Sequence, residues 1–405
     1  MNISYFISKR LRKGNNQAFS QIIHGIAVAS ISLGLAVMII SFLILKGFQQ
    51  TITDKVVSFG GHLQVSRNTL GQMYNENPIS NQLDFVQNTQ DYPQITHVQQ
   101  YAFKPGLLKS KSEVLGVMLK GVGSDYDSLR FSSNMVAGKF LNLQDTNATM
   151  DIVVSQNIAD QLIIEVGDDV LMYFVQNPPK YRRFTVKGIY ATGMEDFDNR
   201  IIMGDLDMVR QLNNWADSLA GGLEIFVDNF DKLPEYQEEL YQLTDYRYFV
   251  DMVTSRNVQI FDWLALLDRN VIIFFVIILV IASLNMTSIL LILIMERTPM
   301  IGSLMAMGAS NGQLRQIFMA SGMNMVLKGM LIGNIIALGL AAIQYYFKVF
   351  PLDMQNYYMA YVPIYWDWTI IIGLNALVFV LVMLVLLLPA TIISRIQPIK
   401  AIKFD

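Results

Sequence analysis

The residues of this chain that could do covalent chemistry are few and lie far apart. There is no cysteine, and the three histidines, His24, His62 and His97, are scattered. A chain without cysteine can form neither a disulfide nor a thiolate metal site, and histidines so widely spaced give little support for a shared metal. The sequence also lacks the glycine-rich phosphate loop with its lysine, the nucleophile elbow and the paired histidines of zinc proteases. We therefore expect no catalytic residue, no cofactor and no metal on the chain itself.

One short segment instead has the pattern of a surface helix that could receive force from another protein. Residues 299–307 follow Thr298, a candidate N-cap, begin with Pro299 in the first turn, and end at Gly308, a candidate left-handed stop. Ser310 and Gln313 then have the spacing of a capping box for the next helix. On geometry alone, an ordinary connector at the membrane surface is an equally good interpretation. The apolar residues that fall on one face of the predicted short helix are Met300, Ile301, Leu304 and Met307.

The composition requires both a membrane and an aqueous environment. The 405 residues are 53% hydrophobic and have a mean hydropathy of +0.36. A membrane span takes about 20 apolar helical residues. No small-residue cleavage site follows the first apolar stretch, so we expect a retained span rather than a signal peptide. Four spans are predicted, at about residues 22–45, 271–295, 321–347 and 368–388.

The distribution of charge predicts how the chain crosses the membrane. Residues 49–270 contain 18 Lys and Arg against 29 Asp and Glu, whereas the rest of the chain contains 12 against 4. Because basic residues remain on the cytoplasmic side, both termini are expected in the cytoplasm of a multi-pass membrane protein. The predicted organisation is residues 1–48 as cytoplasmic N-terminus and first span, 49–268 as an exported domain with stalk ends, and 269–405 as three spans with a cytoplasmic tail.

The exported segment mixes strand and helix patterns, which indicates an α+β or α/β domain. Helical spacing just before the second span, at residues 258–267, suggests that this span continues outward as a stalk, and residues 46–53 could do the same for the first. Predicted strands include residues 61–65, 170–175, 184–190 and 223–227, and predicted helices are residues 156–163, 205–212 and 234–243.

A Pro-Pro pair separates two of these strands and predicts a projecting hairpin tip. A solvated turn that contacts nothing is the simpler interpretation. A contact with another molecule is the functional one, and its residues would be Pro178, Pro179, Lys180, Arg182 and Arg183.

The predicted spans contain few polar residues. No series of carboxylates runs through them, which argues against a proton pump or an ion channel. Gly329 and Gly333 permit close helix packing. The loop at residues 348–367 is rich in tyrosine and tryptophan, as expected for the lipid headgroup layer.

Two motifs and the layout resemble the permease subunits of type VII ABC transporters. The layout of one span, a large exported domain and three further spans is similar to that group. The tail from Pro389 to Lys403 resembles its closing motif. The segments from Gly47 to Gln49 and from Phe59 to Leu63 are most similar to its lipoprotein-releasing members. The residues that resemble the group's cytoplasmic coupling helix are Glu296, Arg297, Ile301, Gly302, Leu304, Ala306, Gly308 and Ala309.

The resemblance implies four transmembrane helices with a large extracytoplasmic α+β domain, and a permease without its own ATPase motif. A cytoplasmic ABC ATPase dimer would bind ATP and Mg, and a second permease subunit, identical or related, would complete the assembly. The substrate would be a lipoprotein released from the inner membrane and passed to a periplasmic carrier, with contacts to membrane lipids and none to nucleic acid. The hairpin residues Pro178, Pro179, Lys180, Arg182 and Arg183 lie at the position where one of the paired lipoprotein-releasing permeases contacts this carrier. The implied ATPase-coupling residues are Glu296, Arg297, Ile301, Gly302, Leu304, Met307 and Gly308.

Two alternatives remain open at this stage. The same fold is used by exporters of drugs or peptides related to the macrolide exporter. It is also used by the cell-division permease, which transmits shape changes to cell-wall hydrolases. The exported segment, about 220 residues by the predicted boundaries, is larger than we would expect for the division-type permease.

Overall fold

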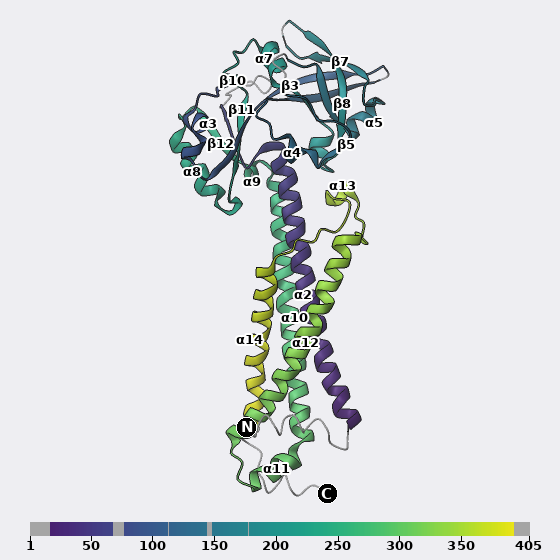
Figure 1. Cartoon of the computed structure of the whole chain (residues 1–405), viewed down its shortest axis with the longest axis vertical. Coiled ribbons are helices and arrows are strands. Elements are labelled where there is room, and N and C mark those ends of the chain that lie inside the picture. The colour runs from purple at the N-terminus through teal and green to yellow at the C-terminus, as the bar shows by residue number, and fades with distance from the viewer. Residues whose placement is uncertain (1–16, 68–76, 112, 144–147, 177, 393–405) are drawn as a thin grey trace. The chain divides into compact units, whose positions relative to one another are not determined.

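The computed structural model describes residues 17–67, 77–111, 113–143, 148–176 and 178–392 (Figure 1). The chain divides into two compact units. The helical unit comprises residues 1–50, 263–351 and 361–405, and the α+β unit comprises residues 51–262 and 352–360. The basic N-terminal cluster and most of the predicted tail motif lie outside the described residues.

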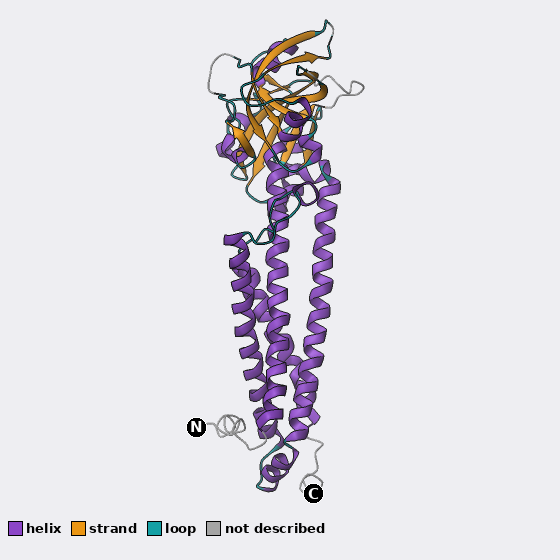
Figure 2. Cartoon of the chain, turned by 90° about the vertical axis from the view of Figure 1, so that its right-hand side faces the viewer, coloured by secondary structure: helices purple, strands orange, loops and turns teal. Residues whose placement is uncertain are grey.

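The described residues contain four helices long and apolar enough to cross a membrane (Figures 1 and 2). This confirms the four predicted spans, each within a longer helix. The helices α2 and α10 contribute residues to both units, so the predicted helical extensions of the first two spans are also confirmed. The helices that supply the spans are α2 (Gln17–Gly60), α10 (Val258–Glu296), α12 (Asn311–Phe347) and α14 (Trp368–Ile392), and two short helices, α11 (Thr298–Ala306) and α13 (Met354–Tyr357), lie in their connections.

Small and polar residues bring α12 close to α2 and α14. A Cβ added at Gly329 of α12 would lie 2.8 Å from Ile31 Cβ of α2, and one at Gly333 would lie 2.7 Å from the Ser32 carbonyl oxygen. These glycines therefore allow α2 and α12 to approach closely, as their spacing predicted. Asn334 and Asn375 exchange side-chain hydrogen bonds of 2.7 and 3.0 Å between α12 and α14.

The α+β unit is built on a ten-stranded sheet in the order β12-β1-β11-β3-β4-β9-β6-β8-β5, with β7 pairing β3 and β8. The β4–β9 and β6–β8 pairs are parallel and the others are antiparallel. The strands are β1 (Leu63–Arg67), β3 (Ile95–Lys109), β4 (Val114–Val122), β5 (Met135–Gly138), β6 (Asp151–Ser155), β7 (Asp169–Phe174), β8 (Lys180–Tyr190), β9 (Ile201–Asp205), β11 (Gly222–Val227) and β12 (Tyr248–Met252), and a separate pair is formed by β2 (Ile79–Ser80) and β10 (Leu219–Ala220).

Six of these strands close into a ring, because β7 joins β8 back to β3. The ring runs β3-β4-β9-β6-β8-β7, and its strands supply much of one hydrophobic core of the unit. Helices cover its ends and the neighbouring sheet. These helices are α3 (Asp84–Gln87), α4 (Ser128–Ser132), α5 (Gln156–Leu162), α6 (Glu195–Asp198), α7 (Leu206–Asn213), α8 (Leu233–Leu243) and α9 (Val253–Arg256), with short 3-10 turns η2 (Thr89–Asp91) and η3 (Phe230–Lys232).

Candidate functional site

The connection between α10 and α12 forms a stiff elbow around the short helix α11. Gly308 has a φ of 95°, the left-handed conformation that favours glycine. Its amide donates to the Met305 carbonyl, and the Ala309 amide donates to the Leu304 carbonyl, which is the Schellman pattern. The predicted stop of this helix is therefore confirmed.

The next helix begins with the predicted capping box. The Ser310 hydroxyl accepts from the Gln313 amide at 3.3 Å, and the Gln313 side chain accepts from the Ser310 amide at 2.9 Å. Two defined helix ends thus lie within six residues of one another, so the connection has little freedom of its own.

The prediction that Thr298 caps α11 is wrong. Thr298 is the first residue inside the helix, and the N-cap residue Arg297 makes no side-chain capping bond. The Thr298 hydroxyl instead donates to the Ile294 carbonyl at 3.1 Å. A threonine directly after a helix can satisfy the preceding turn rather than the following one, because both carbonyl and amide groups are within its reach.

The predicted coupling residues divide between two faces of the elbow. Ile301 and Gly302 are buried, and Leu304 is partly buried against the same core as the long helices. Met307, in contrast, is 76% exposed, and Gly308 is exposed beside it. The structure therefore assigns Ile301 and Leu304 to holding α11 on the helical unit, and leaves Pro299, Ser303 and Met307 accessible.

Glu296 and Arg297 lie where α10 ends. Their side chains approach to 3.7 Å and are each about three-quarters covered. Among the described residues, Oε2 of Glu296 is buried without a hydrogen-bond partner. A carboxylate oxygen buried without a donor costs free energy in the folded chain.

The predicted hairpin is formed by β7 and β8, and its residues do not act as one basic cluster. Lys180 donates to the Leu212 carbonyl at 3.1 Å, and Arg182 donates to its neighbour Tyr181. Pro178, Pro179 and Arg183 are exposed. Sequence reasoning missed the apolar part of this surface, formed by Val175, Tyr173 and Tyr181, which are 62%, 40% and 62% exposed.

An apolar hollow of about 260 Å³ lies between α2 and α10 within the helical unit. Two of its aromatic rings, Phe42 and Phe275, meet edge to face at 5.9 Å. Ser41 supplies a hydroxyl to an otherwise apolar lining. The residues that line it are Val37, Met38, Ser41, Phe42, Val271, Phe274, Phe275 and Ile278.

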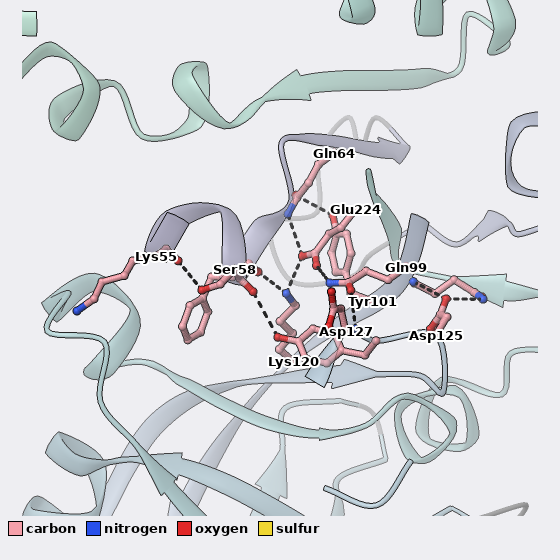
Figure 3. Close-up of polar contacts among 12 residues, drawn as sticks. Lys55, Ser58, Gln64, Gln99, Tyr101, Lys120, Asp125, Asp127 and Glu224 are labelled. Atoms are coloured by element: carbon pink, nitrogen blue, oxygen red, sulfur yellow. Dashed lines mark hydrogen bonds and ion pairs between the residues drawn. The ribbon is translucent and has the colours of Figure 1, made fainter. Parts of the chain in front are cut away.

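A buried polar network, shown in Figure 3, holds the end of α2 in the α+β unit. The ammonium of Lys120 lies 2.6 Å from Glu224, both side chains are fully buried, and Lys120 also donates to the Phe59 carbonyl at the end of α2. Gln64 and Gln99 donate to the Glu224 carboxylate at 3.2 and 2.7 Å. Burial lowers the pKa of Lys120 below its usual value, and the Glu224 carboxylate offsets this only in part.

Aromatic packing anchors the same helix end. The Phe59 ring stacks on Phe197 at 4.8 Å and contacts Phe131 and Tyr190 at 5.2 and 5.5 Å. Phe59 itself is buried. The last turn of α2 is therefore part of the domain core. The sequence did not predict the contact between Lys120 and Glu224, because the two residues are far apart in the chain.

These features define a class of protein: a membrane permease whose large α+β domain is inserted between its first and second long helices. Residues 25–240, more than half of the chain, match the MacB-like periplasmic core domain, and residues 272–398 match the FtsX-like permease C-terminal domain. The chain belongs to the family of FtsX-like permeases with a MacB-like periplasmic core domain.

Relatives of nearly the same length are similar to this chain throughout. The lipoprotein-releasing system transmembrane protein LolC of Neisseria meningitidis is 23% identical, over 98% of this chain and 97% of that protein. The corresponding LolE of Haemophilus influenzae is 21% identical over 99% of both. The crystal structure of the periplasmic region of MacB from Actinobacillus actinomycetemcomitans aligns with 50% of this chain and 95% of its own, at 13% identity and a TM-score of 0.35.

Proposed function

We propose that this chain is the permease subunit of an ABC transporter that couples a separate cytoplasmic ATPase dimer to the release of lipoproteins from the inner membrane. Relatives named as transmembrane proteins of the lipoprotein-releasing system match almost the whole chain. The feature of the structure that carries the proposal is the apolar hollow between α2 and α10. Acyl chains are the part of a lipoprotein that such a lining would accept, since it offers apolar area and almost no hydrogen-bonding groups.

The connection around α11 would contact the ATPase, which binds the ATP and Mg, and would move with its conformational change. Met307 offers an exposed apolar contact, and the partly exposed ion pair of Glu296 and Arg297 lies at the end of α10. Ile301 and Leu304 would pass the movement on, because they pack into the core of the long helices. In this arrangement both termini and α11 are cytoplasmic, and the α+β unit lies in the periplasm.

A periplasmic carrier would be met by the β7–β8 hairpin. Its exposed residues combine apolar and basic character, in Val175, Tyr181 and Arg183. A second permease subunit, identical or related, would complete the assembly.

Reconstitution tests the proposal directly. The chain is incorporated into liposomes with its cognate ATPase and a triacylated lipoprotein, and release to a soluble carrier is measured with ATP present. We expect ATP-dependent release, and we expect Ser41→Trp, which fills the hollow, to reduce release several-fold while the ATPase still co-purifies. Ile277→Trp is the matched control, since Ile277 lies on α10 outside the lining.

Two results would contradict the proposal. The first is ATP hydrolysis that is stimulated by drugs or peptides and not by lipoprotein, which would favour the exporter function. The second is equal release by the Ser41→Trp and Ile277→Trp variants, which would show that the hollow does not bind the substrate.

A further inference from the structure

The middle of the loop between α12 and α14 packs with the α+β unit rather than with the helices it joins. Residues 352–360 cluster with that unit. Met359 is buried, and α13 forms a single turn within the segment. The Leu352 amide donates to the Ala360 carbonyl at 2.8 Å, which closes the segment at its base. We call residues 352–360 the α13 loop.

A tight turn at residues 192–194 receives the α13 loop. Gly193 has a φ of 77°, and a Cβ there would lie 3.0 Å from Met354 Cγ and 3.1 Å from the Met354 carbonyl oxygen. Glycine is therefore required at this position for two reasons, the backbone conformation and the closeness of the loop.

A buried carboxylate shapes this turn. Asp198 accepts from the Thr192 amide and hydroxyl and from the Gly193 amide, at 2.7 to 3.2 Å. The hydroxyl of Ser155, the N-cap of α5, donates to the Asp198 carbonyl. The turn thus belongs to the core of the domain, and the Thr192 carbonyl has a defined direction.

Lys55, near the end of α2, joins the turn to the α13 loop. Its ammonium donates to the Thr192 carbonyl at 2.5 Å and to the Tyr358 carbonyl at 2.6 Å. Figure 3 shows the Lys55 side chain directed away from the Lys120 and Glu224 pair, so this contact is separate from the buried network. Both acceptors are backbone carbonyls, so the contact depends on where the two loops lie and not on the side chains at 192 and 358.

The backbone at Tyr358 is held in a conformation that it would seldom adopt alone. Its φ is 60°, in the left-handed region that bulky residues avoid. Such a conformation persists only when its surroundings impose it. The Lys55 bond and the Gly193 contact are part of the surroundings that hold Tyr358.

We propose that Lys55 is a positioning residue that fastens the α13 loop to the periplasmic domain, so that α12 and α14 pull on the domain through this loop in addition to α2 and α10. The proposal rests on the proposed transport function for its mechanical role. The fastening itself is independent of any substrate. The chain connectivity makes the consequence direct, since the loop continues into α12 on one side and α14 on the other.

Hydrogen exchange of the purified full-length chain tests the fastening without ATPase or lipoprotein. In Lys55→Ala, the amides of Leu352 and Tyr358 should exchange about tenfold faster or more, because a charge-assisted hydrogen bond to the loop is lost. Lys46→Ala is the matched control, an exposed lysine on the same helix. Unchanged exchange in the Lys55→Ala loop would overturn the proposal.

A glycine pair checks the same contact without removing a charge. Gly193→Ala should also speed exchange of the α13 loop. Gly167→Ala provides the control, because Gly167 has a φ of 101° but no atom within 4 Å of an added Cβ. Equal effects of the two variants on the loop would count against a direct contact at Gly193.

A covalent tie tests the mechanical role. The chain has no cysteine, so Lys55→Cys and Tyr358→Cys introduce a single pair and remove the Lys55 ammonium at the same time. In this double variant, lipoprotein release should fall several-fold while ATP hydrolysis continues, and joining the two thiols with a short bifunctional maleimide should restore release. Normal release by Lys55→Ala with a demonstrably loosened loop, or no recovery on cross-linking, would overturn the mechanical role and leave the transport assignment unaffected.

Discussion

At the scale of single residues, the most consequential feature is the buried pair of Lys120 and Glu224. Two charges removed from water cost free energy that their attraction only partly offsets, so such a pair is a weak source of stability. Its structural effect is specific: Lys120 supplies a donor to the Phe59 carbonyl, which the end of a helix would otherwise leave without a partner. The pair thus determines where α2 ends inside the domain.

Removing one charge should therefore be costly. Lys120→Met leaves the Glu224 carboxylate buried without its cation, and we expect the domain to lose about 3 to 5 kcal/mol of unfolding free energy. Denaturant unfolding of the purified chain measures this. Adding Glu224→Gln should recover part of the loss, and a Lys120→Met single variant as stable as the parent would refute the assigned role.

His62 makes a second residue-scale prediction, a loss of stability in acid. Burial, with the Arg130 guanidinium adding to it, lowers the pKa of His62 from 6.5 to about 4, and its Nδ1 accepts from the Val227 amide at 2.9 Å. The unfolded chain then binds a proton that the folded chain does not. Stability from this group is complete above pH 6.5 and is lost as the pH falls toward 4.

The expected size is about 2 kcal/mol between about pH 7 and about pH 5. Unfolding of the parent and of His62→Gln at both pH values checks it, since glutamine can accept from Val227 but does not titrate. The variant should lose less stability than the parent over this range. An identical pH dependence in the two proteins would be inconsistent with a neutral, buried His62.

At the scale of elements, one side of α11 packs into the core of the long helices and the other side is exposed. Ile301 is fully buried, and Met307 is 76% exposed only six residues later. Substitutions on the two sides should therefore fail in different ways. A charged residue at Ile301 or Leu304 disturbs the packing of the long helices, whereas one at Met307 alters only the surface.

Met307→Asp should accordingly reduce co-purification of the ATPase without lowering the yield or melting temperature of the permease. Ile301→Asp should lower the yield itself. Asn311→Asp, an exposed change of equal charge at the start of α12, is the control for charge alone. If Met307→Asp retains the ATPase as well as Asn311→Asp does, Met307 is not a docking residue.

At the scale of the whole molecule, the chain forms two units, and continuous helices cross two of the boundaries between them. The first segment of the α+β unit, residues 51–262, begins within α2 and ends within α10. The family relationship applies to both units, since the periplasmic core and the permease domain are matched in sequence order. In a membrane protein with this organisation, we expect the two units to lie in different environments.

Single-cysteine labelling tests this topology, because the natural chain has no cysteine to interfere. Tyr246→Cys, at a residue 94% exposed in the α+β unit, should react with a membrane-impermeant reagent when the inner membrane is intact. Met307→Cys should react only after that membrane is broken. The opposite pattern would place the domain in the cytoplasm and contradict the proposed mechanism.

The sequence by itself determined the features that depend on local rules. Four spans followed from the length of apolar helix that a bilayer requires, and the helix stop at Gly308 and the capping box at Ser310 followed from bonds between near neighbours. Helices such as α5 and α7 were predicted to within one or two residues for the same reason. The resemblance of the coupling and tail motifs also indicated the family.

Only the tertiary structure decided which side of α11 faces the core, because an apolar stripe shows that one face is buried but not against what. The same limit applies to Lys120 and Glu224, and to Lys55 and Tyr358, which are separated by 104 and 303 positions in the chain. Their contacts exist because the sheet and the α13 loop bring distant backbone together. Pairings of that kind leave no periodic mark in a single sequence, so they could not be predicted from it.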